Sequence, residues 1–125
     1  MDSRKKFHFE TEEPTGGAIV FHLRGRLRGW PECFEFQESA RESVTSGRRM
    51  VLDMEQLEHI DSTGVGILAT LYTSAKNGGG ELVLASLQPK VSRILDMLWF
   101  LRILRHVDTV DEALALPAAP PPAES

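Results

Sequence analysis

The chain has a single cysteine and no long apolar run, and each of these shortages excludes a class of protein. A single cysteine, Cys33, among 125 residues cannot form an internal disulfide, which suits a reducing compartment. No apolar stretch is long enough to cross a bilayer, and residues 1–13 are charged and lack the apolar centre of a signal peptide. We therefore expect a cytoplasmic protein that does not bind a membrane.

Basic residues are also scarce relative to acidic ones. The chain has 14 Lys and Arg against 18 Asp and Glu, a net charge of −4. Non-specific binding of nucleic acid depends on neutralising phosphates, so we expect no nucleic-acid partner. The four histidines, at positions 8, 22, 59 and 106, show no metal-ligand spacing, and we expect neither a metal nor a cofactor.

The most informative stretch is residues 50–80. An apolar run at 50–54 is typical of a buried strand, and residues 56–60 form a polar-rich connection. Residues 61–63, Asp-Ser-Thr, offer three candidate N-caps before an apolar-periodic helix. Asn77 and three glycines end this helix, and a second apolar run follows at 81–85. Strand, loop, helix and strand in this order predict a parallel pair with a helical crossover.

The flanking segments extend the same alternation. Before the central stretch we expect strands at 6–10 and 18–23 as a hairpin, a loop at 25–29, and a helix from Pro31 to Gly47. After it we expect a helix from Pro89, a short strand at 103–107 and a last helix ending at Ala115. The helices should bury two stripes; the residues are Cys33, Phe36, Ala40 and Val44 in the first, and Val91, Ile94, Leu95 and Leu98 in the second.

These elements predict one α/β domain over residues 1–116, with a mixed sheet of about five strands and helices mainly on one face. Residues 117–125 are Pro/Ala-rich, and we expect them to be a disordered tail. Met97, Trp99, Phe100 and Leu101 form an apolar cluster that the sequence assigns either to the core or to a second interface.

Three interpretations compete for the motif around Ser62. The serine or its neighbours are only a helix cap, worth about 1 kcal/mol. Alternatively the motif is catalytic, but its glycine stands one residue later than in the Asp-Thr/Ser-Gly of aspartic proteases, and no histidine lies at triad spacing. The third interpretation is a regulated binding surface, because Ser62, Gly66, Thr70 and Thr73 share one small, polar helix face.

Two features favour the binding surface. Gly64 and Gly66 each weaken a helix by about 1 kcal/mol relative to alanine, which suggests that something approaches the backbone closely there. A phosphate on Ser62 adds a charge of about −1.5 to −2, and a helix N-terminus tolerates it. Phosphorylation would then block a docked partner while the domain stays folded.

At these residues the chain resembles the STAS domain family, specifically the stand-alone bacterial anti-sigma factor antagonists. The resemblance covers about residues 7–116. It is most specific at Val-Leu-Asp-Met, 51–54, and at Ile-Asp-Ser-Thr-Gly-Val-Gly, 60–66; it is supported by 20–25, 80–84 and 111–114.

The resemblance implies a non-enzymatic, partner-switching protein that needs no cofactor and regulates sigma-factor-dependent transcription. In its unphosphorylated form it binds an anti-sigma factor that is also a serine kinase. Phosphorylation at the position of Ser62 releases it, and a PP2C-type phosphatase reverses the change. The implied contact residues are Asp61, Thr63, Gly64, Gly66 and Thr70.

One loop differs from the family pattern. Where relatives usually carry an acidic residue after the second strand, this chain has Arg28, a cation that can pair with a phosphate. Trp30 follows as a partner anchor or a cap on the core. We expect a monomer or weak dimer. The alternative function is a STAS interaction module of a transport or signalling-scaffold system that is not phosphorylated.

Overall fold

The fold of the chain was taken from a computed structural model, which describes residues 7–14, 16–28 and 32–117. Strands and helices alternate along the sequence, as predicted for an α/β domain. In chain order the elements are β1 (His8–Glu12), β2 (Ile19–Leu27), α1 (Glu32–Thr45), β3 (Arg49–Ile60), α2 (Ser62–Asn77), β4 (Glu81–Ala85), α3 (Pro89–Met97), the 3₁₀ helix η2 (Phe100–Arg102), β5 (Arg105–Val107) and α4 (Val110–Ala115).

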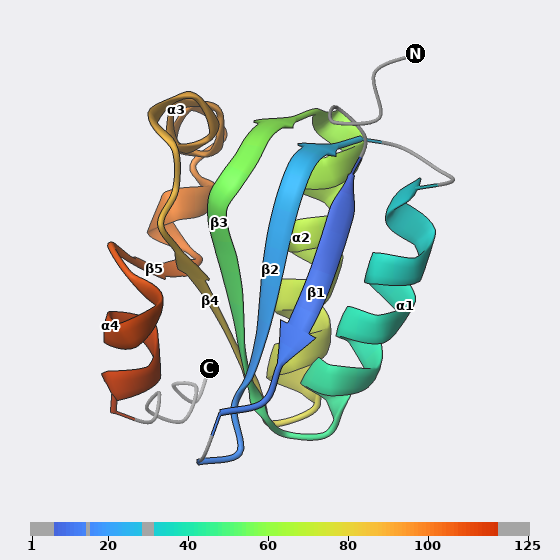
Figure 1. Ribbon diagram of the computed structural model, residues 1–125, viewed down its shortest axis with the longest axis vertical. Coiled ribbons are helices and arrows are strands. Elements are labelled where there is room, and N and C mark those ends of the chain that lie inside the picture. Colours follow the sequence, from blue (N-terminus) through green and yellow to red (C-terminus); the bar gives the residue numbers. More distant parts are fainter. Residues whose placement is uncertain (1–6, 15, 29–31, 118–125) are drawn as a thin grey trace, which may run out of the picture.

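All five strands form one mixed sheet in the order β1-β2-β3-β4-β5 (Figure 1). The β1–β2 pair is the expected antiparallel hairpin, and each later pair is parallel. Parallel neighbours must be joined by a crossover, which α1, α2 and the α3–η2 segment provide. The carboxyl ends of β2 and β3 therefore lie together at one edge of the sheet.

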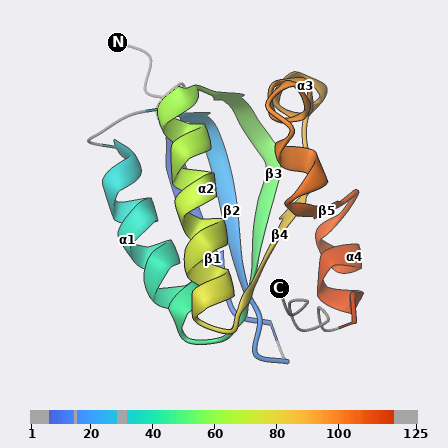
Figure 2. The same cartoon turned by 180° about the vertical axis from the view of Figure 1, so that it is seen from behind.

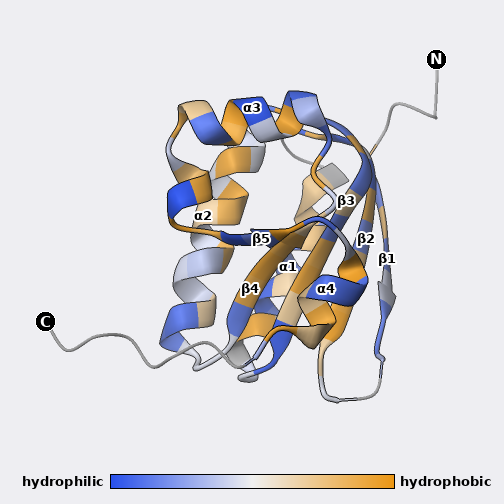
Figure 3. Cartoon of the chain, turned by 90° about the vertical axis from the view of Figure 1, so that its left-hand side faces the viewer, coloured by the Kyte–Doolittle hydropathy of each residue, from blue (hydrophilic) through white to orange (hydrophobic). Residues whose placement is uncertain are grey.

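The helices are divided unequally between the two faces of the sheet. Helices α1 and α2 lie side by side behind β1, β2 and β3, whereas α4 lies on the opposite face near β4 and β5 (Figures 1 and 2). The large core fills the space under α1 and α2 and includes the predicted stripe Cys33, Phe36, Ala40 and Val44. A smaller cluster, centred on Val51, Val83 and Ala113, lies beneath α4 (Figure 3).

Strands β2 and β3 are longer than the sequence pattern predicted. The predicted loop at 25–29 begins too early, because β2 continues to Leu27; the predicted polar connection at 56–60 belongs to β3. Leu27 pairs with Ile60, and both side chains are almost completely buried. Two register shifts interrupt the β2–β3 ladder. These irregularities break the period-2 pattern, so the strand residues resemble a loop in the sequence.

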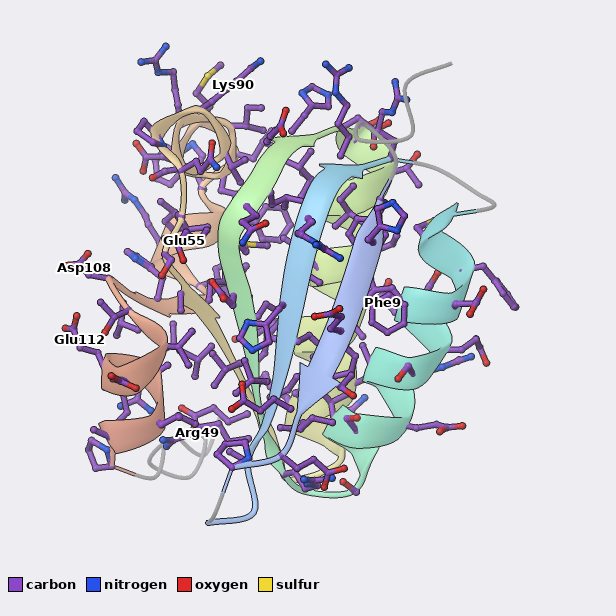
Figure 4. All side chains as sticks on the ribbon, in the orientation of Figure 1. Phe9, Arg49, Glu55, Lys90, Asp108 and Glu112 are labelled. Atoms are coloured by element: carbon purple, nitrogen blue, oxygen red, sulfur yellow. The ribbon has the colours of Figure 1, made fainter. Side chains whose placement is uncertain are left out.

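The last described residues of the chain are tied to the start of β3 by Arg49 (Figure 4). Its guanidinium donates to the carbonyl oxygens of Ala113 at 3.0 Å and Leu116 at 2.7 Å, and it pairs with Glu81 at 2.8 Å. The carbonyl of Pro117 also accepts from Arg49, at 2.8 Å. Pro117 is the first of the residues predicted to form a tail; the others, 118–125, lie outside the described residues, so the tail stays a prediction.

Two further sequence predictions meet different outcomes. Cys33 is buried, as expected of a small core residue. Leu98, assigned to the buried stripe of the third helix, is instead 52% exposed, because α3 ends at Met97 and Leu98, its C-cap, no longer follows the helical period. Within the described residues, no helix combines the length and apolarity that crossing a membrane requires.

Candidate functional site

The predicted site lies where β3 ends and α2 begins. Ile60, the last residue of β3, pairs with Leu27 of β2, and the next amide, that of Asp61, donates to the carbonyl oxygen of Leu27 at 3.3 Å. Arg28 directly follows Leu27, so the paired strands bring Arg28 and Asp61 to the same edge of the sheet. Arg28 is exposed.

Asp61 is the residue that caps α2. Its backbone is extended, with φ −109° and ψ −173°, and its Oδ1 accepts from the amide of Gly64 at 2.9 Å. Its carbonyl oxygen accepts from the amide of Val65 at 2.9 Å. Both interactions are those of an N-cap. Of the three cap candidates in the sequence, the structure therefore selects the aspartate, and Ser62 is the first residue inside the helix.

Ser62 is exposed in the first turn of α2. Its hydroxyl has no hydrogen-bond partner within the part of the chain that the structure describes. The other hydroxyls of this face bond to their own helix: Thr70 donates to the carbonyl of Gly66 at 3.0 Å and Thr73 to that of Ala69 at 3.1 Å. The hydroxyl of Ser62 is thus available to chemistry from outside.

The outer face of α2, defined here as Ser62, Gly66, Thr70 and Thr73, is exposed at all four positions. Thr63 is exposed beside it. No charged residue occurs between Ser62 and Ala75. From Ser62 to Thr73 the surface that the helix presents to solvent is therefore small in its side chains and electrically neutral; the exposed Lys76 follows in the last turn.

The two glycines of the motif have different roles. Gly64 is buried, and a Cβ there would lie 2.5 Å from the carbonyl oxygen of Leu27 and 2.6 Å from Cγ1 of Ile60. The close approach predicted for this glycine is therefore an approach of the chain to itself, where the start of α2 crosses the ends of β2 and β3. A Cβ on Gly66 would meet nothing within 4 Å, so only Gly66 leaves backbone open to a partner.

The predicted site has two further residues, Gly64 and Trp30. Gly64 supports the site from inside, as described above. Trp30, predicted as an anchor or a core cap, lies outside the described residues. The structure thus gathers Arg28, Asp61, Ser62 and Thr63 at one end of the sheet, with Gly66 and Thr70 continuing along the helix.

A group that sequence reasoning missed lies on the face of the sheet opposite α1 and α2. His22 on β2 bonds through Nδ1 to Asp53 at 2.7 Å and through Nε2 to Glu12 at 2.8 Å, linking β1, β2 and β3. Burial alone lowers the pKa of His22, but its hydrogen bonds to Glu12 and Asp53 and their charges outweigh burial, and the pKa is raised above 6.5. Strand alternation placed His22 opposite the core; finding its partners required the register.

The arrangement has few features of a catalytic centre. Ser62 has no histidine partner, and among the described residues no group of three or more His, Cys, Asp or Glu side chains could hold a metal ion. What the site offers is an exposed, chemically free hydroxyl at the start of a neutral helix face. These are properties of a surface for recognition and modification.

Comparison with known proteins gives a family for this fold and motif. The model of the STAS domain matches residues 10–113, most of the chain and all of the site. The chain belongs to the STAS domain family. Among its relatives, the anti-sigma F factor antagonist of Paenibacillus polymyxa is 32% identical over 99 residues, which cover 78% of this STAS protein and 85% of the relative.

Solved structures share the STAS fold at lower sequence identity. An anti-sigma factor antagonist from Mycobacterium paratuberculosis is 18% identical with a TM-score of 0.77, covering 91% of this chain and 96% of that one. The phosphorylated form of the Bacillus cell fate determinant SpoIIAA is 19% identical with a TM-score of 0.68, covering 86% and 96%. These likenesses confirm the predicted mixed α/β architecture.

Proposed function

We propose that this STAS protein is an anti-sigma factor antagonist that is switched by phosphorylation of Ser62. The observation that carries the proposal is that, at the start of α2, one residue caps the helix and a different residue offers a free hydroxyl. Asp61 caps the helix, whereas Ser62 is exposed and its hydroxyl has no partner among the described residues. The serine therefore has no structural duty that a modification would interrupt.

In the proposed cycle, the unmodified protein docks through the outer face of α2 on an anti-sigma factor that is also a serine kinase, and so frees the sigma factor. Thr63, Gly66 and Thr70 are the expected contacts, with Arg28 at the rim. Transfer of phosphate to Ser62 releases the protein, and a PP2C-type phosphatase restores it. The antagonist name of the Paenibacillus polymyxa relative supports the function, and the phosphorylated Bacillus structure supports the modification.

Electrostatics explain why one phosphate would be sufficient. The outer face of α2 carries no charge, so the phosphate would introduce about −1.5 to −2 charges at a surface matched to a neutral contact. Burying such a group without a partner is strongly unfavourable. The fold itself would tolerate the group, because helix amides and the helix dipole favour an anion at this end, and the exposed Arg28 adds a cation nearby.

The proposal is tested with three baits in a pull-down from the native cell extract: wild type, Ser62→Asp, and Ser46→Asp. Ser46 is exposed just beyond the far end of α1 and controls for the added charge. Wild type and Ser46→Asp should retain an anti-sigma factor with serine kinase activity, whereas Ser62→Asp should not. Intact-mass analysis of the native protein should show one phosphate, absent from Ser62→Ala, which should bind constitutively.

Two results would contradict the proposal. If Ser62→Asp unfolds, the serine is not the exposed residue described above. If all three baits recover the same proteins and Ser62 is never modified, the serine is a plain surface residue. The chain would then be a STAS module of another kind, such as a component of a transport or scaffold system.

A further inference from the structure

The end of α3 and the following 3₁₀ helix expose an unusual set of apolar side chains. Met97 is 72% exposed, Leu98 52%, Trp99 60% and Ile103 53%. We call these four residues together with Arg102 the Trp99 patch. Of the cluster that the sequence assigned either to the core or to an interface, Phe100 and Leu101 pack against the core, whereas Met97 and Trp99 do not. Contiguous exposed apolar residues of this kind mark interaction sites.

Trp99 is held outward by a strained backbone. Its φ is +67°, in the left-handed region that a non-glycine residue adopts only at an energetic cost. It follows Leu98, the C-cap of α3, at the position where helices most often place glycine. The guanidinium of Arg102 lies 4.0 Å from the centre of its ring. Trp99 is therefore exposed, held in a strained backbone conformation and stacked against an arginine, which pre-organises its side chain for contact. Tryptophan and arginine are also enriched in binding hot spots.

The surroundings of the Trp99 patch are basic, in a chain whose net charge is −4. Arg93 and Arg102 are exposed close to the patch; Asp96, next to Met97, is the only acidic residue between Pro89 and Val107, and Lys90 lies at the opposite end of α3. The labelled Lys90 projects away from the domain at α3 (Figure 4). Two such patches would repel each other, so the surface that complements this one must combine an apolar floor with an acidic rim.

The same chain carries a surface of that description at the other end of α3. A groove of about 540 Å³ lies between β3 and the segments leading into α3 and α4. We call it the Asp108 groove. Its apolar lining includes Leu87, Pro89 and Val110, and its acidic lining is Asp53, Glu55, Asp108 and Asp111. Glu55 and Asp108 both lie in the region between α3 and α4 (Figure 4). The volume is ample for a tryptophan side chain.

Helix α3 connects the two surfaces. It has 9 residues, so its ends are about 13 Å apart, with the Asp108 groove at Pro89 and the Trp99 patch from Met97 onward. Figure 3 shows α3 lying across one side of the molecule, with α4 and β5 below it. Two copies that pack with their α3 helices antiparallel can each place a patch into the groove of the other, in one isologous contact with two-fold symmetry.

We propose that the protein forms a homodimer in which the Trp99 patch of each protomer docks into the Asp108 groove of its partner. This surface contains no residue of the outer face of α2, so dimerisation goes beyond the proposed switch and is independent of it. The contact joins basic to acidic groups at the rim, and it therefore weakens with added salt. Small interfaces of this type are reversible, and the dimer forms in a concentration-dependent manner.

The test is sedimentation velocity of the full chain over a range of concentrations, with charge-reversal variants. Arg102→Glu breaks the patch and Asp108→Lys breaks the groove, and each should weaken self-association at least tenfold. Lys76→Glu and Glu35→Lys, exposed positions on α2 and α1, carry the same charge changes elsewhere and should dimerise as wild type does. The decisive sample combines both substitutions in one chain: Arg102→Glu/Asp108→Lys should recover part of the dimerisation lost by either single change, because the new acid in each patch can pair with the new base in the groove of the partner.

A second variant separates docking from folding. Trp99→Gly removes the anchor and relieves the left-handed backbone strain, so it should raise the urea midpoint of the monomer while it weakens the dimer at least tenfold. A wild-type protein that sediments as a monomer throughout would overturn the proposal. So would a dimer unaffected by both single reversals, or a double reversal no better than either single change.

Discussion

The two glycines at the start of α2 should respond in opposite directions to the same substitution. A new Cβ at Gly64 would lie 2.5 Å from the carbonyl oxygen of Leu27, against an ordinary contact of at least 3.4 Å. The obstacle is backbone, and it also accepts the amide of Asp61, so it cannot rotate away. The start of α2 must therefore lift by roughly 0.9 Å for the contact to become ordinary, a displacement on the scale that overpacking produces.

The size of the change in unfolding free energy follows from two opposing effects. Overpacking of this kind destabilises by about 1–3 kcal/mol, and the displacement also strains the Asp61 cap, worth about 1 kcal/mol. Replacing a helical glycine by alanine returns up to about 1 kcal/mol. Gly64→Ala should therefore lose about 1–3 kcal/mol of unfolding free energy. At Gly66, where a Cβ meets nothing within 4 Å, only the gain of about 0.5–1 kcal/mol operates.

Urea denaturation followed by circular dichroism measures both variants against wild type. The expected order of midpoints is Gly66→Ala above wild type above Gly64→Ala, with unchanged slopes. Equal stabilisation by both substitutions would refute the close approach at Gly64. Because Gly66→Ala stays folded and adds a methyl to the outer face of α2, it should also weaken binding of the partner under the proposed function.

Three further predictions concern charge. Ser62→Asp, as a mimic of the phosphorylated protein, should unfold at a slightly higher urea midpoint than Ser62→Asn, and Arg28→Ala should reduce that difference without abolishing it. A midpoint lowered by the negative charge would contradict the helix-dipole argument. Arg49→Ala should lower the free energy of unfolding by about 2–4 kcal/mol in the same assay. It leaves the carboxylate of Glu81 paired with Arg105 alone, and it leaves the carbonyl oxygens of Ala113 and Leu116 without the donor that Arg49 supplies. A loss below about 1 kcal/mol would mean that Arg49 and Glu81 behave as a solvated surface pair. His22 has a raised pKa, so its contribution to the stability of the fold is fully present below pH 6.5 and declines as the pH rises through the raised pKa. His22→Gln should flatten this dependence of the unfolding free energy on pH, and an unchanged pH profile would exclude His22 as its source.

The sequence pattern was sufficient for the α/β architecture and for placing the Ser62 motif at the start of a helix. Alternating apolar runs and capped periodic segments predicted one α/β domain, and the motif at 60–66 placed an exposed serine at a helix start. Which of three adjacent cap candidates would cap was not predictable. Asp61, Ser62 and Thr63 have similar N-cap preferences, and the outcome depends on the extended backbone that Asp61 adopts because its amide is held by Leu27.

Long-range contacts account for most of the differences. Gly64 was predicted to leave room for a partner, because the residues next to it in the sequence do not reveal that the carbonyl oxygen of Leu27, on β2, lies against it. The ends of β2 and β3 looked like loops, because their pairing is irregular. Leu98 fitted a helical period that the chain leaves at Met97. For Gly64 and for the ends of β2 and β3, the deciding atoms lie in a different element from the residues that they constrain.

The cap on α2 has a consequence for how signalling can change over time. Because Asp61 holds the helix, the neighbouring position is free to be serine, alanine or aspartate with little effect on the stability of the domain. Under the proposed function, a single substitution at Ser62 would therefore make the protein permanently active, permanently silent or responsive, without a compensating change elsewhere. The proposed modification site, Ser62, and the residue that caps the helix, Asp61, are adjacent but separate, so each can be altered without the other.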